Sequence, residues 1–163
     1  MFRNTIVPMD DTELMIEVAS LDEASDILIS PQGCSEVKCL ISIGDEEDEL
    51  PAGYENVSYK MRLLVADVVT ELGASEEDIR QIIILAEGLR GESGKILIHC
   101  AAGVSRSPAV ALILYACWLG PGREQEAMER VLAQRPIAIP NRRMVEMADR
   151  QLHRSGNLVA VLG

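Results

Sequence analysis

The chain has 163 residues, of which 48% are hydrophobic and 25% are charged. This length is enough to bury one sizeable core and too short for two ordinary domains joined by a linker, and the proportions exclude disordered and fibrous classes, so we expect one globular domain over residues 1–163. The net charge of -11 disfavours nucleic acid and anionic membranes as partners, because both are bound through clustered Lys and Arg side chains.

The beginning of the chain gives no sign of export. It lacks the uninterrupted apolar stretch of a signal peptide and turns acidic within a dozen residues. The longest apolar run, 109–119, falls well short of the roughly 20 residues that span a bilayer. The four cysteines form no CxxC pair and would stay reduced in the cytosol. We therefore expect a cytoplasmic protein without a membrane anchor or a disulfide framework.

The first third of the chain predicts a strand, a helix and a second strand. Leu14 to Val18 indicates a short strand, and Ser20 to Glu23 matches a capping box, which opens a helix. Residues 37–43 are apolar enough for a buried strand ending at Gly44. The acidic run from Asp45 to Glu49 follows, and such a run is typical of a solvated loop.

The middle of the chain predicts a strand and a well-delimited helix. Residues 57–65 alternate loosely and carry β-branched and aromatic side chains, which favours a strand that delivers Asp67 at its C-terminal end. Ser75 is a typical N-cap and is followed by three acidic residues in the first turn. This helix is expected to run to about Arg90, where Gly91 stops it.

The last part predicts one more strand and three helices. Residues 95–99 form a short apolar strand, and residues 107–119 form a helix that is apolar almost all round and therefore buried. After the break at 120–122, helices are expected at 124–134 and 142–153. The sum is an α/β domain with a central, mostly parallel sheet flanked by helices and with a loop between a core strand and a buried helix.

The segment between that strand and that helix carries a pattern of reactive residues. It reads His99-Cys100-Ala101-Ala102-Gly103-Val104-Ser105-Arg106-Ser107. The bare spacing of the cysteine and the arginine is expected by chance roughly 0.3 times in a chain of this composition. Adding the histidine, the glycine and the serine after the arginine lowers this to roughly 2 in 100,000, so the full pattern is specific.

Each residue type in the pattern suits phosphate chemistry. A loop containing Gly103 can curl so that successive backbone N–H groups point inward, and the following helix adds its positive N-terminal end. This cradle would bind a substrate phosphate or the ions phosphate, sulfate, tungstate and vanadate. The same field would keep Cys100 ionised at neutral pH. The residues expected to bind the anion are Ala101, Ala102, Gly103, Val104, Ser105 and Arg106.

Three side chains have individual expected roles. Arg106 offers a planar fork of donors that can hold two phosphate oxygens. Ser107 can donate its hydroxyl to the sulfur and so help Cys100 to leave. His99 is expected to orient the loop through hydrogen bonds, because a thiolate needs no general base. No metal ion or cofactor is required.

The pattern from His99 through Pro108-Ala109-Val110 resembles the signature of the cysteine-based protein tyrosine phosphatases, and of their compact dual-specificity group in particular. The resemblance implies a phosphatase that acts on phosphorylated proteins or small phosphate monoesters through a phosphocysteine. Asp67, 33 residues before Cys100, matches the family's general acid. Asn141 after Pro140 is similar to an asparagine that braces the phosphate loop in those enzymes, although helix capping alone would explain it.

Other interpretations stay open at this point. A strand-end aspartate can also serve turn amides, and Asp45 and Asp48 are rival acids to Asp67. Ala101 and Ala102 replace the lysine of lipid-phosphate members of the superfamily, which disfavours phosphoinositides. The same cradle could belong to a non-catalytic phosphate-binding module, or the loop cysteine to a rhodanese-like sulfurtransferase. Neither the preferred phosphorylated residue nor a redox partner of Cys100 can be read from the chain.

Overall fold

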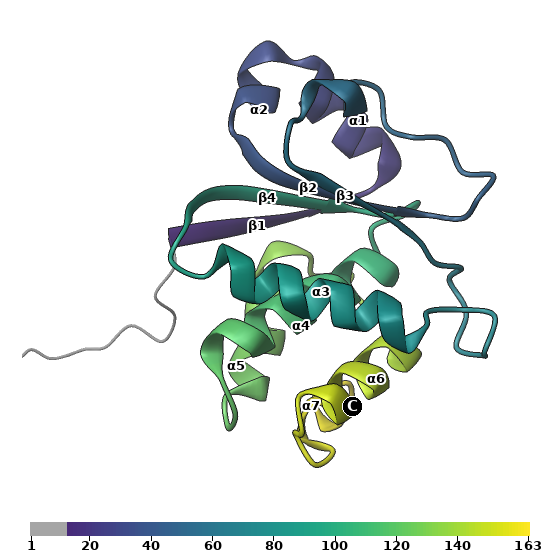
Figure 1. The fold of residues 1–163 in the computed structure, drawn as a ribbon, viewed down its shortest axis with the longest axis vertical. Coiled ribbons are helices and arrows are strands. Elements are labelled where there is room, and N and C mark those ends of the chain that lie inside the picture. Colours follow the sequence, from purple (N-terminus) through teal and green to yellow (C-terminus); the bar gives the residue numbers. More distant parts are fainter. Residues whose placement is uncertain (1–12) are drawn as a thin grey trace, which may run out of the picture.

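A four-stranded parallel sheet lies at the middle of the protein in the computed structural model, which describes residues 13–163 (Figure 1). The strand order is β1-β4-β2-β3, and every pairing between these strands is parallel. The strands are β1 (Glu13–Ala19), β2 (Val37–Gly44), β3 (Lys60–Leu64) and β4 (Ser93–His99). The predicted α/β domain with a central parallel sheet is confirmed.

Helices cover both faces of the sheet (Figure 1). One face carries α1 (Leu21–Ile29), α2 (Pro31–Ser35) and the 3-10 turn η2 (Tyr54–Asn56). The other face carries α3 (Glu76–Leu89), α4 (Arg106–Leu119), α5 (Glu124–Gln134), α6 (Arg142–Gln151) and α7 (Asn157–Ala160).

The apolar core is split by the sheet into a large and a small cluster. Along β4, Ile96 and Ile98 pack into the large cluster around α4, whereas Leu97 packs into the small cluster under α1. This alternation follows from the period of two along a strand. With both faces covered, the central strands read as nearly continuous apolar runs, as is usual for parallel sheets.

Helix α4 is the centre of the larger layer. All of its residues are buried, as the sequence predicts from an apolar surface without a polar face. It packs against α3, α5 and α6, and the indole of Trp118 donates to the carbonyl of Ala86 at 2.9 Å. The first residue of this helix is Arg106, so the fold holds the predicted phosphate loop against the most deeply buried helix.

Several element bounds differ from the sequence-based expectation. Strand β3 is shorter than the predicted 57–65, because Val57 ends the turn η2 and packs into the small cluster. Strand β4 begins two residues before Lys95. Helix α6 ends at Gln151 instead of His153.

Three short elements, α2, η2 and α7, were not predicted at all, because each is too short to show a periodic pattern. Within residues 13–163, no helix is both long enough and apolar enough to cross a membrane.

Candidate active site

The predicted phosphate loop lies at the carboxyl end of β4, in the middle of the sheet. In the strand register, His99 is level with Ala19 of β1 on one side and with Ser42 of β2 on the other. The loop from Cys100 to Ser105 follows, and α4 begins at Arg106. The loop therefore occupies the edge of a parallel sheet at which ligands usually bind in open α/β folds.

The backbone carbonyl groups of this loop point outward, toward the surrounding elements. The six carbonyl groups from Cys100 to Ser105 all accept hydrogen bonds of 2.7 to 3.1 Å from groups around the loop. The donors are, in order, His99 Nδ1, Leu21 N, Arg135 Nη2, Arg135 Nε, Ile139 N and Asn141 N. Because the C=O and N–H of a trans peptide point in opposite directions, the N–H groups of residues 101–106 point to the inside of the curl.

The sulfur of Cys100 lies at the centre of the curl. It accepts from the backbone N–H of Gly103 at 3.3 Å and of Ser107 at 3.5 Å, and it lies 3.2 Å from the hydroxyl of Ser107. The donors suit an anionic sulfur. Burial raises the thiol pKa of Cys39 to about 11 and that of Cys117 to about 12.

Arg106 lies buried beside the loop with an unsatisfied donor. The residue is 4% exposed, and its Nη1 donates to the carbonyl of Val65 at 2.8 Å. Its Nε is buried and has no hydrogen-bond partner among the described residues. A buried guanidinium N–H without a partner is costly, and an oxyanion in the cradle would satisfy it.

One carboxylate oxygen of Asp67 accepts two hydrogen bonds, one from the loop and one from the segment before α6. Its Oδ1 accepts from the Ser105 hydroxyl at 2.7 Å and from the Asn141 side-chain amide at 3.2 Å. Its Oδ2 has no such partner within residues 13–163. The structure thus places Asp67 against Ser105 of the loop, although Asp67 lies 33 residues before Cys100 in the sequence.

Asn141 connects three segments at this site. Its side-chain oxygen accepts from Met144 N and so caps α6, as predicted from the sequence. Its side-chain amide also donates to the carbonyl of Val68, and its backbone N–H donates to Ser105. The side chain thus caps α6 and holds the segment of Asp67, whereas the contact with the phosphate loop is made by the backbone.

His99 is part of a directed chain of hydrogen bonds that ends on the loop. Arg62 donates to the Ser42 hydroxyl at 2.8 Å, Ser42 is 2.7 Å from His99 Nε2, and His99 Nδ1 is 3.1 Å from the carbonyl of Cys100. A carbonyl only accepts, so Nδ1 carries the proton and Nε2 accepts from Ser42. Burial, and next the charges of Arg62 and Arg106, lower the pKa of His99, which favours this neutral ring.

This neutral histidine makes a pH-dependent contribution to stability. Because its folded pKa lies below the unfolded value, the contribution is complete above about pH 6.5 and is lost as the pH falls toward the folded pKa. We expect urea unfolding to give a steeper loss of stability between about pH 7 and pH 5 for the wild type than for His99→Gln. The exposed His153→Asn variant should keep the wild-type slope. Parallel slopes for wild type and His99→Gln would contradict the assignment.

Two carboxylates that the sequence placed in a solvated loop also reach the site. Asp48 and Glu49 line a small pocket of about 30 Å³ together with Cys100. Asp48 Oδ2 lies 4.0 Å from Arg106 Nη1. The loop is exposed, as expected, but its position is explained by topology. It leaves the carboxyl end of β2, which is next to β4, and the carboxyl ends of parallel strands meet at one edge.

We expect Asp48→Asn to tighten oxyanion binding, because it removes a negative charge beside Arg106. The carboxylate is 39% exposed, so solvent limits the gain to about 2- to 5-fold in the tungstate dissociation constant. The gain should shrink at high salt. Competition of tungstate with an aryl phosphate measures it, with Asp45→Asn as the control on the same loop. A collapse of turnover in Asp48→Asn would instead make this residue the acid.

The described part of the chain offers no evident metal centre. No group of three or more His, Cys, Asp and Glu side chains within residues 13–163 is arranged to hold a metal ion. Of the predicted site residues, all lie around the one loop, from His99 to Ser107 with Asp67 and Asn141 beside it. Sequence reasoning missed Ser42, Arg62 and Arg135, which reach the loop only through tertiary contacts.

No family model matches the chain. Among curated proteins, it is 29% identical over 109 residues to dual specificity protein phosphatase 15 of Mus musculus, covering 67% of this chain and 43% of that protein. It is 37% identical over 62 residues to dual specificity protein phosphatase 5 of Rattus norvegicus, covering 38% of this chain and 16% of that protein. The chain thus spans less than half the length of the curated relatives it matches.

Solved structures share the fold. The crystal structure of DUSP15 matches with a TM-score of 0.63 and 24% identity over 90% of this chain and 89% of that one. Tk-PTP in the active form matches with a TM-score of 0.62 and 18% identity over 87% and 92%. The crystal structure of a mouse putative dual specificity phosphatase complexed with zinc tungstate matches with a TM-score of 0.59 and 20% identity. This match covers 91% of this chain and 87% of that one. The chain therefore has the fold of these phosphatase structures, and its sequence is similar to that of dual-specificity phosphatases over two thirds of its length.

Proposed function

We propose that this chain is a cysteine-dependent phosphatase that hydrolyses phosphate monoesters, with phosphotyrosine and also phosphoserine or phosphothreonine of proteins as substrates. The observation that carries the proposal is the outward set of six carbonyls, which leaves inward N–H groups around the Cys100 sulfur. We assign residues 1–163 to one catalytic domain. The substrate class rests on the likeness to dual-specificity phosphatases.

In the first step, the Cys100 thiolate attacks phosphorus in line with the leaving oxygen. The S–P bond forms, the bond from phosphorus to the leaving oxygen breaks, and Asp67 gives its proton to that oxygen. Ser105 and Asn141 hold Asp67 Oδ1, which leaves Oδ2 as the atom that carries the proton. The inward N–H groups and Arg106 hold the phosphoryl oxygens, where charge gathers in the transition state.

In the second step, water attacks phosphorus and the S–P bond breaks. Asp67, now ionised, takes a proton from the water, and inorganic phosphate leaves. The sulfur departs as a thiolate, which the Ser107 hydroxyl at 3.2 Å and the N–H of Gly103 at 3.3 Å stabilise. Asp67 ends protonated, so the site is ready for another turnover.

The fold alone does not separate an enzyme from a binding module. A neighbour at TM-score 0.63 is a human tyrosine phosphatase-like serine/threonine/tyrosine-interacting protein. The enzyme proposal is supported by the residues, because Cys100 and Arg106 flank one loop and Asp67 accepts from the Ser105 hydroxyl of that loop.

The direct test is hydrolysis of p-nitrophenyl phosphate and of matched phosphotyrosine and phosphothreonine peptides in the presence of a chelator. We expect turnover of the aryl ester and of both the phosphotyrosine and the phosphothreonine peptides. Tungstate binding without hydrolysis of any ester would indicate a binding module. Sulfur transfer from thiosulfate to cyanide without phosphatase activity would indicate a sulfurtransferase.

Asp67→Ala is expected to lower kcat by about 100- to 10,000-fold, the range in which general acid catalysis contributes. The loss should be larger for an alkyl phosphate than for p-nitrophenyl phosphate, because a poor leaving group needs the proton more. Steady-state kinetics with both substrates measures this difference. Unchanged activity, or an equal loss with both leaving groups, would remove Asp67 from the acid role.

A further inference from the structure

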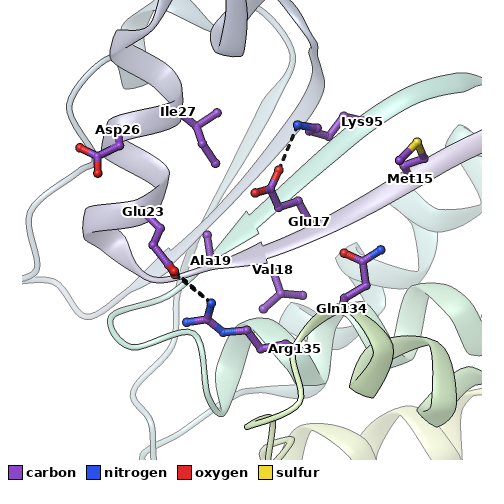
Figure 2. A pocket seen from close by; sticks show the side chains of 10 residues that line it. All are labelled: Met15, Glu17, Val18, Ala19, Glu23, Asp26, Ile27, Lys95, Gln134 and Arg135. Carbon is purple, nitrogen blue, oxygen red and sulfur yellow. Dashed lines mark hydrogen bonds and ion pairs between the residues drawn. The ribbon is translucent and has the colours of Figure 1, made fainter.

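A cavity of about 520 Å³ lies behind the phosphate loop, away from the Cys100 pocket. Figure 2 shows that its walls come from β1, β4, α1 and the C-terminal end of α5. Glu23 and Arg135 form an ion pair across one end of this cavity, with Arg135 Nη1 2.9 Å from Glu23 Oε1. Neither residue takes part in the two steps of the proposed reaction.

Arg135 uses all three of its guanidinium nitrogens. Nε donates to the carbonyl of Gly103 at 3.1 Å, Nη2 donates to the carbonyl of Ala102 at 3.1 Å, and Nη1 faces Glu23. The side chain is 17% exposed. Among residues 13–163, Arg135 is the only side chain that donates to two of the six outward carbonyls.

The two carbonyls that Arg135 holds determine where two inward N–H groups point. The carbonyl of Ala102 belongs to the peptide whose N–H is that of Gly103, and this N–H donates to Cys100 Sγ at 3.3 Å. The carbonyl of Gly103 belongs to the peptide whose N–H is that of Val104. Because each peptide is planar, fixing its oxygen fixes its N–H.

Arg135 packs closely against the loop at Gly103. A Cβ added at Gly103 would lie 2.7 Å from Arg135 Nη2 and 2.9 Å from the backbone of Ala19, and the φ of Gly103 is +72°. The loop is therefore packed between the end of β1 and the guanidinium. A glycine is required here both by the backbone conformation and by this close approach.

Glu23 holds the guanidinium from the other side. Its carboxylate also accepts from the Ser20 N–H at 2.8 Å in the capping box of α1. The Ser20 N–H, and next the hydrogen bond from Arg135, lower the pKa of Glu23. A carboxylate already fixed at a helix start is a firm anchor for a guanidinium. The position of α1 is thereby transmitted to the phosphate loop.

We propose that the Glu23–Arg135 pair is a positioning clamp that aims the N–H groups of Gly103 and Val104 at the oxyanion. The proposal rests on the phosphatase function proposed above. Arg135 touches neither the sulfur nor the substrate and acts through the two peptides it holds. Lysine cannot replace it, because an ammonium on a flexible stem lacks the planar fork that serves two neighbouring carbonyls and a carboxylate at once.

The test compares Arg135→Ala and Arg135→Lys with the wild type in the full chain. We expect the tungstate dissociation constant to rise at least about tenfold in both variants and kcat to fall by about 10- to 100-fold, as when preorganised donors are lost. Arg123→Ala is the matched control, because Arg123 lies at the other end of α5 and pairs with Glu126. It should behave as the wild type.

Chemical rescue separates positioning from general stability. Arg135 lines an open cavity, so its removal leaves a space that free guanidinium can enter. Added guanidinium, at concentrations below those that unfold the chain, should restore tungstate affinity and kcat to Arg135→Ala, whereas ammonium should not. The further change Glu23→Gln should weaken this rescue, because it removes the anion that holds the added cation.

Three outcomes would overturn the clamp. They are wild-type tungstate affinity in Arg135→Ala, full activity in Arg135→Lys, and no guanidinium rescue in a variant that melts at the wild-type temperature. If Arg135→Ala melts lower, rescue of tungstate affinity at a temperature where it is folded decides the matter. If the wild type binds tungstate and hydrolyses nothing, the proposed function fails, while tungstate affinity still tests the clamp.

Discussion

Replacement of Cys100 by serine is expected to abolish turnover of p-nitrophenyl phosphate, with a loss of more than about 10,000-fold. A serine hydroxyl needs a base to become a nucleophile. The nearest imidazole, His99, cannot serve, because its Nδ1 proton is donated to the Cys100 carbonyl and its Nε2 accepts from Ser42. The cradle depends on carbonyls held from outside, so tungstate binding should survive.

The control for this variant is Cys117→Ser, a buried thiol on α4 whose high pKa keeps it protonated. It should keep wild-type kcat. Acid-quenched wild-type enzyme should carry phosphate on a peptide containing Cys100, and Cys100→Ser should not. Comparable turnover in Cys100→Ser and the wild type would remove the thiolate from the mechanism and with it the proposed function.

Arg106→Lys is the second change with a very large expected effect, a loss of about 1,000-fold or more in kcat, the scale found for arginines that stabilise transferring phosphoryl groups. The guanidinium does two things that an ammonium cannot do together. Its Nη1 holds the carbonyl of Val65, two residues before Asp67, and its unsatisfied Nε remains for the anion. Lysine would therefore loosen the acid segment as well as the phosphate.

The matched control for this change is Arg143→Lys. Arg143 donates a single hydrogen bond to the carbonyl of Ala74, which an ammonium can also make. Steady-state kinetics should show near wild-type kcat for Arg143→Lys. The Arg106→Lys variant should also bind tungstate less tightly than Cys100→Ser does. An Arg106→Lys enzyme with wild-type kcat would show that phosphate is held by the backbone alone.

The acidic character of the chain and its anion site are compatible because the attraction is local. The net charge is -11, and Asp48 lies 4.0 Å from Arg106. Against this, the inward N–H groups act at contact distance, where their dipoles outweigh charges that solvent screens. The acidic loop should therefore lower the affinity for anions without abolishing it.

Local chemistry made several elements predictable from the sequence. In the structure, capping boxes are formed by Ser20 with Glu23 and by Ser75 with Asp78. Helices α1 and α3 therefore begin where these residues predict. Each box is made within four consecutive residues and does not need the rest of the fold. The burial of α4 was also predictable, because its surface is apolar all round. The sequence did not show which elements pack against it.

Long-range contacts could not be predicted in the same way. Arg135 meets Glu23 across 112 positions, and Arg62 meets Ser42 across 20, with each residue on a different element. No pattern near these residues distinguishes them from ordinary surface charges. The approach of Asp48 to Arg106 likewise depends on β2 lying beside β4, a strand order that the sequence does not state.

The sequence by itself determined the identity and order of the reacting groups in the loop, because the spacing from His99 to Ser107 and the strand and helix around it are local properties of one segment. The tertiary structure alone decided what keeps that segment curled. Five of the six carbonyls are held by donors from the start of α1, from the end of α5 and from the segment before α6. Such donors meet the loop only after the chain has folded, since backbone hydrogen bonds between distant segments depend on how elements pack.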